Sequence, residues 1–335
     1  MSAFENTAVL LLNVGTPQSP RPGHVATYLA QFLGDKYVLS LPWLFRQLLV
    51  RGFIVPFRAF TSAAKYRRIW TDEGSPLLVH SQNLQRGLQS HLAPMRVRLA
   101  MRYGEPSIAR VLHELMQAPP SRLVVVPLFP HYSQATTGTG LAELMRCMAR
   151  YAFMPSLHVV EPLSALPAFH QSLGEMLRRH AESFQPEHLL LSFHGLPLSH
   201  VHAACGAGCR RACQAPASPT SRCYIHQCHL TSQALAAHVE GLPFSTAFQS
   251  RMRGSAWTSP FSLEVATSLA RQGCRRLLVA CPSFVCDCLE TLEEVGVEMR
   301  EAFLGAGGEA MKVVPCLNDE ALWVSTLSKD VVAGM

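Results

Sequence analysis

No stretch of this chain stays apolar for the roughly 18 residues that a membrane-spanning helix requires. Its first residues, MSAFENTAVLLLNVG, also lack the basic leader and the long apolar core of a secretory signal, and residues 8–12 are instead typical of a first strand. We therefore expect a cytoplasmic protein without a membrane span.

Charged side chains are also scarce. They make up 16% of the 335 residues and hydrophobic residues make up 48%, which is typical of a packed globular protein of about two domains and not of a disordered chain. The net charge is only +6, and the sequence has no dense basic stripe with interleaved aromatics, as a nucleic-acid-binding surface would. The composition argues against nucleic acid as a partner and is compatible with acidic small molecules or an anionic membrane surface.

Walker and GxGxxG spacings are absent, so nucleotide binding is not supported. A weaker anion-binding pattern occurs at residues 127–140, PLFPHYSQATTGTG, which follow a predicted strand and open a helix. The hydroxyls of Ser133, Thr136 and Thr137 and the backbone N–H groups at the helix start suit a carboxylate-bearing ligand. A plain polar loop that caps the helix is the alternative.

The eleven cysteines are an odd number and are expected to be reduced in a cytoplasmic protein, so we do not predict a complete disulfide framework. Four of them share one short segment that is poor in large apolar residues, with the spacing C-x3-C-x3-C-x9-C: Cys205, Cys209, Cys213 and Cys223. Four thiolates bind structural zinc or an iron–sulfur cluster, and spacing alone neither separates the two nor excludes free thiols. Cys228, five residues further on, could replace one of the four.

Short apolar runs alternate with helix-length segments along the whole chain, which predicts an α/β fold. The strands are almost continuously apolar, as parallel strands covered on both faces are. A similar tail follows the last strand of each half, LHVVEPLSALPAF and MKVVPCLNDEALW, so we expect two Rossmann-like domains, each with a four-stranded parallel sheet flanked by helices. One continuous doubly wound sheet is the alternative. The expected strands are residues 9–14, 97–103, 123–128, 157–160, 189–193, 246–249, 277–280 and 312–314, and expected helices include residues 106–117, 140–151, 167–183, 231–239, 260–271 and 289–303.

The stretch LLLSFHGLP, residues 189–197, places His194 where a buried strand gives way to a loop with glycine and proline. In open α/β sheets, ligands bind at the carboxyl ends of the strands. Because an imidazole exchanges a proton near neutral pH with little tuning, His194 is a candidate base. A structural histidine at a strand end is the alternative.

An acidic cluster, CPSFVCDCLETLEEVGVEMRE, follows a later predicted strand. On a helix that begins near Asp287, the carboxylates of Glu290, Glu294 and Glu298 recur every four residues and line one face. Aligned like charges repel, so this face is either solvated and paired with cations from elsewhere, or a polar track for protons or hard divalent cations. His194 ends one strand and Glu290 follows another, so these two proton-exchanging groups are expected to face each other.

Residues 38–60, VLSLPWLFRQLLVRGFIVPFRAF, break the alternation of strands and helices. They are rich in Leu, Phe and Val, but Arg46, Arg51 and Arg58 occur at spacings that exclude a membrane span. One interpretation is an apolar lip over a greasy ligand that also rests on a bilayer, with the arginines at the headgroups. An ordinary buried helical hairpin is the alternative.

Several of these stretches together resemble the ferrochelatase family, whose members insert ferrous iron into protoporphyrin. The motifs LLLNVGTP, MRYG, PHYSQATTG, SFHGLP, FQSRMRGSAW and CPSFVCDCLETLEEV occur in the family's order through nearly the whole chain. The resemblance implies insertion of Fe²⁺ into protoporphyrin IX to form protohaem, with release of two protons, as the terminal step of haem biosynthesis. It also implies two Rossmann-like domains with the porphyrin in a cleft: residues 1–165 joined by a returning helix at 318–335, and residues 166–317.

By the same resemblance, His194 corresponds to the family's catalytic histidine and Glu290 to its partner acid, and both would contact the substrate iron. Glu294 and Glu298, together with Asp287, resemble the family's path for metal or protons. The residues expected to contact the porphyrin are Arg102, Tyr103, Ser133, Trp257 and Phe284, and residues 38–60 correspond to the membrane-facing lip. The chain departs from many relatives at Cys288, where they carry a histidine.

A cysteine-rich insertion at residues 203–225 follows SFHGLP and resembles a bacterial subset of the family that holds a [2Fe–2S] cluster through internal cysteines. Cys228 fits the ordinary family pattern Cys-x-x-Thr. The resemblance therefore implies that the cluster ligands are Cys205, Cys209, Cys213 and Cys223, with structural zinc as the alternative.

Two other functions are compatible with the sequence. One is a chelatase for coproporphyrin or another tetrapyrrole, and the other is a porphyrin or haem carrier, which would need the pocket but not the acidic face. We expect protoporphyrin IX and ferrous iron as partners, peripheral association with the cytoplasmic face of the membrane through the lip, and a monomer or a dimer.

Overall fold

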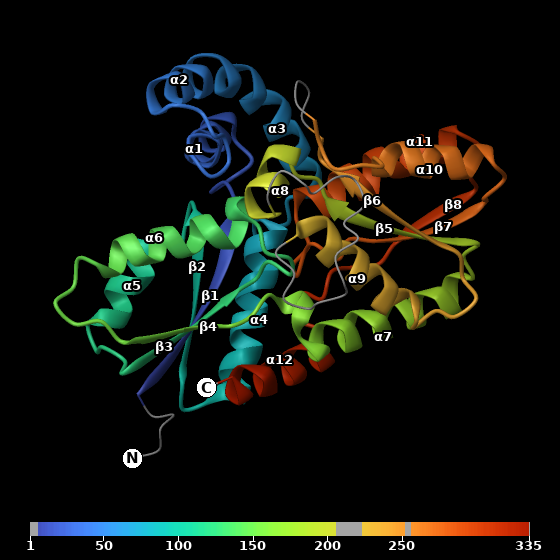
Figure 1. The fold of residues 1–335 in the computed structure, drawn as a ribbon. Coiled ribbons are helices and arrows are strands. Elements are labelled where there is room, and N and C mark those ends of the chain that lie inside the picture. The colour runs from blue at the N-terminus through green and yellow to red at the C-terminus, as the bar shows by residue number, and fades with distance from the viewer. Residues whose placement is uncertain (1–5, 206–222, 252–255, 335) are drawn as a thin grey trace. The chain divides into compact units, whose positions relative to one another are not determined.

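The computed structural model describes residues 6–205, 223–251 and 256–334, which form two compact units (Figure 1). Each unit contains one four-stranded sheet in which every strand pair is parallel. The predicted α/β class with two four-stranded parallel sheets is confirmed, and the alternative of one continuous sheet is wrong.

Unit 1 consists of residues 1–129, 133–160 and 318–335. Its sheet has the strand order β2-β1-β3-β4. The central strand β1 is buried along almost its whole length because it pairs with β2 on one side and β3 on the other, which explains its unbroken apolar sequence. The strands are β1 (Thr7–Gly15), β2 (Arg96–Tyr103), β3 (Arg122–Pro127) and β4 (Ser156–Val159).

Helices cover both faces of this sheet. The helices of unit 1 are α1 (Pro22–Leu33), α2 (Trp43–Gln47), the π-helix η1 (Leu48–Ile54), α3 (Val55–Ile69), α4 (Pro76–Leu92), α5 (Ile108–Met116), the π-helical turn η2 (Gln134–Gly138), α6 (Thr139–Met148) and α12 (Ala321–Ala333). On one face, α5 and α6 form a core with Leu10 and Leu12 of β1, while α4 and α12 lie on the opposite side (Figure 1). α4 and α12 approach closely at Gly87, where a Cβ atom would lie 3.1 Å from Val324.

Unit 2 consists of residues 130–132 and 161–317, and its sheet has the order β6-β5-β7-β8. Its elements are the short η3 (Leu163–Ala165), α7 (Pro167–Phe184), β5 (His188–His194), α8 (Leu198–Cys205), α9 (Tyr224–Ala236), β6 (Phe244–Gln249), α10 (Ser262–Arg271), β7 (Arg276–Ala280), the π-helix η4 (Glu290–Met299), α11 (Arg300–Gly305) and β8 (Ala310–Val313). α10, η4 and α11 pack on one face of the sheet around Phe303, and α7 and α9 lie on the other (Figure 1).

The acidic helix differs from the sequence prediction in its hydrogen bonding. The sequence predicted one α-helix over residues 289–303, whereas the structure begins it as the π-helix η4 and ends it as α11. A π-helix, with i→i+5 hydrogen bonds, has more residues per turn than an α-helix. Residues four apart are therefore slightly less than one turn apart and still fall on the same side. The carboxylates of Glu290, Glu294 and Glu298 therefore keep the predicted common face.

Candidate functional site

The chemistry-bearing residues of unit 2 gather at the carboxyl ends of its strands, where parallel sheets bind ligands. His194 is the last residue of β5 and pairs with Gln249, the last residue of β6. The neighbouring strand β7 ends at Ala280, and the loop after it carries Ser283 and Phe284. Figure 1 shows these strands side by side in unit 2.

His194 is half-buried, and the centroid of its ring lies 6.0 Å from that of Phe284 in an edge-on arrangement. Burial lowers the pKa of His194 below its ordinary value, and the nearby Glu290 carboxylate raises it part of the way back. A lowered pKa keeps the imidazole neutral near pH 7, so that one ring nitrogen has a free lone pair. Within unit 2, the predicted carboxylate is thus close enough to the predicted histidine for its charge to raise the histidine's pKa.

Gln249 joins the two halves of this arrangement, and the sequence reasoning did not single it out. It is 3% exposed, and its Nε2 donates to the backbone carbonyl of Glu290 at 3.1 Å. Its Oε1 accepts from Ser192 at 2.5 Å, and the Ser192 hydroxyl also contacts that of Ser262 at 2.8 Å. The one local sequence signal was a glutamine that directly follows two apolar residues at the end of its strand.

The predicted acidic face runs from the interior to the surface. Glu290 and Glu294 are half-buried, and Glu298 is exposed. Glu294 Oε2 accepts a hydrogen bond of 2.5 Å from Ser250, whose φ of 62° is in the left-handed region that non-glycine residues rarely adopt. The unusual backbone of Ser250 directs its hydroxyl toward this face.

Asp287 lies just before this helix and is 6% exposed. Its carboxylate accepts from Thr291 Oγ1 at 2.8 Å and from the backbone N–H of Cys316 at 3.2 Å. These bonds connect the start of the helix to the loop after β8, so Asp287 has a structural role there whatever else it does.

Trp257 lies beside the backbone that follows His194. It forms an isolated bridge with Pro197, and a Cβ atom on Gly195 would lie 3.3 Å from its indole ring and 2.6 Å from the carbonyl oxygen of Gln249. Only glycine permits this approach at position 195. Trp257, Phe284 and His194 thus belong to one local group of unit 2.

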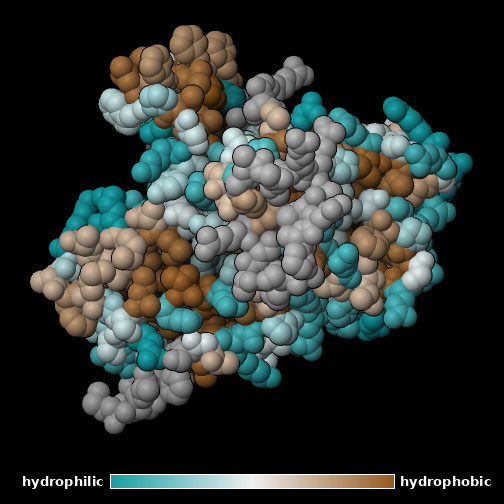
Figure 2. Space-filling model, in the orientation of Figure 1, coloured by the Kyte–Doolittle hydropathy of each residue, from teal (hydrophilic) through white to brown (hydrophobic). Residues whose placement is uncertain are grey.

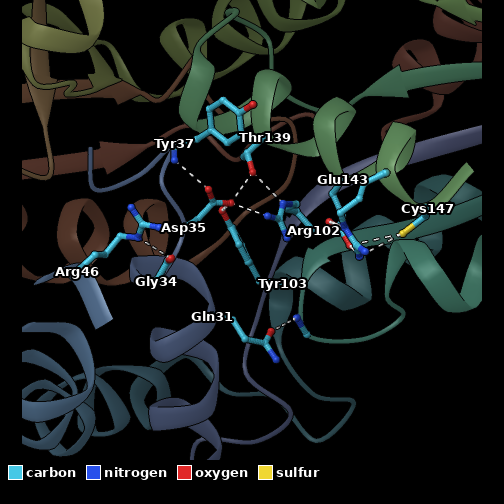
Figure 3. Close-up of polar contacts among 12 residues, drawn as sticks. Gln31, Gly34, Asp35, Tyr37, Arg46, Arg102, Tyr103, Thr139, Glu143 and Cys147 are labelled. Carbon is cyan, nitrogen blue, oxygen red and sulfur yellow. Dashed lines mark hydrogen bonds and ion pairs between the residues drawn. The ribbon is translucent and has the colours of Figure 1, made fainter. Parts of the chain in front are cut away.

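In unit 1, Arg102 and Tyr103 end strand β2 and converge on a residue that sequence reasoning missed, Asp35 (Figure 3). Asp35 Oδ2 accepts from Arg102 at 2.5 Å, from the Tyr103 hydroxyl at 2.8 Å and from Thr139 at 2.6 Å, and Oδ1 accepts from the N–H of Tyr37 at 2.9 Å. Arg102 Nε donates as well to Thr139 Oγ1, at 2.8 Å. The polar ends of both predicted porphyrin contacts are thus engaged by an aspartate that is 8% exposed.

These contacts shift the acidities of both buried partners. Burial alone would raise the pKa of Asp35, but the hydrogen bonds from Thr139, the Tyr37 N–H and Tyr103, together with the Arg102 charge, bring it below its ordinary value. Burial, followed by the Asp35 charge, raises the pKa of Tyr103, which keeps its hydroxyl a donor. Asp35 is therefore ionised and holds Arg102 and Tyr103 in place.

Ser133 precedes η2 and is 6% exposed. Its hydroxyl lies 2.7 Å from that of Thr136, and its carbonyl accepts from the backbone N–H groups of Thr136 and Gly138. Two of the three predicted anion-binding hydroxyls, those of Ser133 and Thr136, therefore contact each other, and the third residue, Thr137, is 7% exposed.

Residues 38–60 form α2, η1 and the start of α3, and they expose large apolar side chains. Figure 2 shows these brown side chains gathered over α2. The alternative of a buried helical hairpin is wrong, because Trp43 is 69% and Phe57 76% exposed. The exposed apolar residues of this lip are Leu41, Trp43, Leu44, Phe45, Leu48, Leu49, Phe53, Phe57 and Phe60.

Arg46 corrects one part of the lip prediction. We expected all three arginines at lipid headgroups, but Arg46 is 7% exposed and its guanidinium donates to the backbone carbonyls of Gly34, Leu39 and Leu41. Arg51 and Arg58 are exposed as expected. Arg46 therefore fixes the base of the lip from inside.

Two of the four cysteines in the insertion lie among the described residues. Cys205 ends α8, and Cys223, which is buried, directly precedes α9. Cys209 and Cys213 lie outside the described residues. Among residues 6–205, 223–251 and 256–334, no group of three or more His, Cys, Asp or Glu side chains is placed to hold a metal ion, and no helix is long and apolar enough to cross a membrane.

A model of the ferrochelatase family matches residues 6–334 of the chain. Curated proteins named ferrochelatase from three bacteria are similar over almost the full length. Those of Legionella pneumophila, Azotobacter vinelandii and Pseudomonas savastanoi are 39%, 41% and 42% identical over 328, 333 and 331 residues, each alignment covering 96% of this chain and, in the same order, 98%, 97% and 96% of the relative.

Two solved structures share the fold at low sequence identity. SirB from Bacillus subtilis with Fe³⁺ aligns with a TM-score of 0.57 at 10% identity, covering 98% of this chain and 95% of that one. CbiX, described as the terminal enzyme of sirohaem biosynthesis in denitrifying bacteria, aligns with a TM-score of 0.51 at 14% identity, covering 98% and 99%. At these identities the likeness concerns the fold alone.

Proposed function

The chain belongs to the ferrochelatase family and is a metal chelatase of the lyase class, and we propose that it inserts Fe²⁺ into protoporphyrin IX to form protohaem, the terminal step of haem biosynthesis. Metallation replaces two pyrrole N–H protons with one Fe²⁺, so two protons leave for each iron that enters. A base must therefore stand at the reacting centre while the metal arrives.

His194 is the proposed acceptor of the pyrrole protons, and Glu290 is its partner, which relays protons or guides iron. The observation that supports this assignment is that Gln249, which pairs with His194 at the end of β5, donates to the Glu290 carbonyl at the start of η4 at 3.1 Å, and the Glu290 charge raises the pKa of His194. Both groups would contact the substrate iron. A neutral imidazole beside a carboxylate can accept a proton and share its charge with the carboxylate.

Glu294 and Glu298 are the proposed continuation of this path. Their carboxylates share the Glu290 face of η4; Glu294 is half-buried like Glu290, and Glu298 is exposed. Carboxylate oxygens are suitable ligands for hard cations and suitable carriers of protons. Asp287, at the buried end, is proposed to support the path through its bonds to Thr291 and Cys316.

The proposed porphyrin contacts are of two kinds. Trp257 and Phe284 supply apolar ring surface close to His194. Arg102, Tyr103 and Ser133 supply polar groups in unit 1, where Asp35 already engages the first two, so their contribution to the porphyrin would come through their remaining donors and ring surface.

Fe²⁺ insertion is tested with His194→Ala and Glu290→Gln under anaerobic conditions. Loss of a general base typically costs about 10²- to 10⁴-fold in rate, so we expect kcat to fall by at least about 100-fold for His194→Ala while protoporphyrin binding, measured by fluorescence, is retained. Near wild-type iron insertion by His194→Ala with the porphyrin bound would refute the assignment.

Two other functions are distinguished by the same assay. If the protein were a carrier, the Glu290→Gln variant would bind porphyrin as well as the wild type does. Neither the wild type nor the variant would then insert iron. A chelatase for coproporphyrin or another tetrapyrrole would prefer that ring over protoporphyrin IX in competition. The exposed apolar lip favours the less carboxylated protoporphyrin.

The cysteine segment is proposed to hold a [2Fe–2S] cluster through Cys205, Cys209, Cys213 and Cys223, with structural zinc as the alternative. The support is the donor set, because four thiolates suit either group, and the two described members end α8 and precede α9. Through Cys205 and Cys223, such a cluster would tie the end of α8 to the start of α9.

The cluster predicts a coloured protein whose visible absorbance is bleached by dithionite. Cys209→Ser should abolish that absorbance, whereas Cys274→Ser, outside the segment, should preserve it. A colourless protein containing one zinc would show that the alternative is right.

The lip is proposed to bring the protein to the cytoplasmic face of the membrane as a peripheral protein. Its exposed Trp, Phe and Leu side chains can enter the acyl boundary, and Arg51 and Arg58 can meet anionic headgroups. A porphyrin is apolar enough to partition into the same boundary, which would place the substrate beside the lip.

A further inference from the structure

The backbone of His194 lies at a point where its sheet loses a strand. In a strand, the N–H and C=O of one residue point to the same side, and successive residues alternate. Gly195 donates its N–H to Gln249 of β6 at 2.8 Å, so the polar groups of His194 point to the other side, toward β7. β7 has already ended at Ala280, which pairs with Leu191. Strand pairing therefore provides no partners for His194 on that side.

Two side chains take the place of the missing strand. The N–H of His194 lies 3.1 Å from Ser283 Oγ, its carbonyl oxygen lies 2.7 Å from the Tyr224 hydroxyl, and the two hydroxyls are 3.1 Å apart. The roles follow from chemistry, because an N–H only donates and a carbonyl only accepts. The His194 N–H donates to Ser283, Ser283 donates to Tyr224, and Tyr224 donates to the His194 carbonyl. The three residues form a closed ring with one direction.

Tyr224 is held in place independently of His194. It is 5% exposed, and its ring meets the ring of His131 edge-on at 6.0 Å. His131 Nε2 in turn lies 3.0 Å from the hydroxyl of Thr231, which is on the same helix as Tyr224. The centroid of the His131 ring lies 5.3 Å from that of Phe193. Burial raises the pKa of Tyr224, so its hydroxyl stays protonated and remains a donor.

Ser283 also determines where Phe284 lies. The two residues are adjacent in the loop after β7, and the Phe284 ring is the one that meets the His194 imidazole at 6.0 Å. A bond that anchors Ser283 to the His194 backbone therefore fixes both the imidazole and the ring against it.

We propose that Tyr224 and Ser283 are positioning residues for the iron-insertion reaction, which direct the His194 imidazole by closing a hydrogen-bonded ring on its backbone. This inference rests on the proposed function of His194 as the proton acceptor. Small displacements at a reacting centre lower kcat more than they lower substrate affinity, because four of the five proposed porphyrin contacts, Arg102, Tyr103, Ser133 and Trp257, are not held by this ring.

The test compares Tyr224→Phe, Ser283→Ala and Ser283→Thr with the wild-type protein in anaerobic Fe²⁺ insertion. We expect Tyr224→Phe and Ser283→Ala each to lower kcat by about 10-fold or more, with the protoporphyrin Kd unchanged within about twofold. Ser283→Thr keeps the hydroxyl and should recover kcat to within about threefold of wild type. The double variant Tyr224→Phe/Ser283→Ala should be no slower than the slower single variant by more than about twofold, because the ring acts as one unit.

Ser268→Ala, which removes an exposed hydroxyl on α10, is the matched control and should leave kcat unchanged. Wild-type kcat in both Tyr224→Phe and Ser283→Ala, while His194→Ala is inactive, would overturn the inference alone. An active His194→Ala would overturn the proposed function instead. If the fold losses in kcat of the two single variants multiplied in the double variant, the two residues would not act as one unit and the proposal would be wrong. Weakened porphyrin binding without a fall in kcat would also contradict the proposal.

Discussion

Asp35→Ala should strongly destabilise unit 1, because one carboxylate oxygen of Asp35 accepts hydrogen bonds from three side chains. The substitution leaves Arg102, Tyr103 and Thr139 without the carboxylate oxygen that accepts from all three. Removing one partner of a buried ion pair costs about 3–5 kcal/mol. Because the Arg102 side chain is 19% exposed and can turn partly to water, we expect the lower end, about 3 kcal/mol, or roughly a 100-fold change in the unfolding equilibrium.

The assay is urea-induced unfolding at pH 7. The unfolding is monitored by hydrogen exchange in peptides from β2, so that unit 1 is measured separately. Asp35→Asn keeps the shape and one acceptor oxygen but loses the charge, and it should cost about 1–2 kcal/mol. The double variant Asp35→Ala/Arg102→Ala should cost less than the sum of the single variants, because no unpaired guanidinium remains.

The pH dependence gives a second measurement of the same contact. The pKa of Asp35 is lowered in the folded protein, so its contribution to stability is complete above the unfolded pKa of about 3.9 and is lost as the pH falls through the folded value. The difference between wild type and Asp35→Ala should therefore shrink in strong acid. A difference below about 1 kcal/mol at pH 7, or one that stays constant into strong acid, would refute the reasoning.

Three further predictions concern the other sites. Gly195→Ala places a Cβ atom 2.6 Å from the Gln249 carbonyl oxygen. We expect it to lower the free energy of unfolding, measured by thermal unfolding, by about 1–3 kcal/mol and to lower kcat about 100-fold. An unchanged kcat would show that the backbone next to His194 tolerates displacement. Phe57→Ser removes the most exposed large apolar side chain of the lip and should weaken cosedimentation with anionic lipid vesicles; equal binding would argue against membrane contact through this surface. Glu298→Gln, at the exposed end of the acidic face, should raise the KM for Fe²⁺ by no more than about twofold, whereas Glu290→Gln should abolish insertion; equal losses would contradict a graded path.

Local patterns were sufficient to predict the fold class and to single out His194 and the carboxylates that begin at Glu290 as candidate residues. A parallel strand buried on both faces must be apolar along its length, and so β1 and β5 were recognisable without any partner in view. The same reasoning placed His194 at a strand end, where the structure puts it. The lip was recognisable as an unusual segment, but its exposure was not, because an apolar sequence suits a buried hairpin equally well.

Residues that act through distant partners were missed. Asp35 lies in an ordinary loop, 67 and 68 positions before Arg102 and Tyr103, and no periodic pattern marks it. Arg46 was read as a headgroup contact because its burial depends on backbone carbonyls that its own sequence does not reveal.

An unbroken apolar run and a spacing of four residues are properties of neighbouring positions, so the amino-acid sequence alone was enough to predict two parallel sheets, a histidine at one strand end and a row of carboxylates on one helix. The hydrogen-bonded ring around His194 has no such local signature. It exists because β7 stops short of β5, and because the chain folds so that Tyr224, 30 positions after His194, and Ser283, 89 positions after it, meet the polar groups that the missing strand leaves behind. Where a strand ends is decided by packing across the whole sheet, and the identity of the side chains that replace it could be seen only in the folded protein.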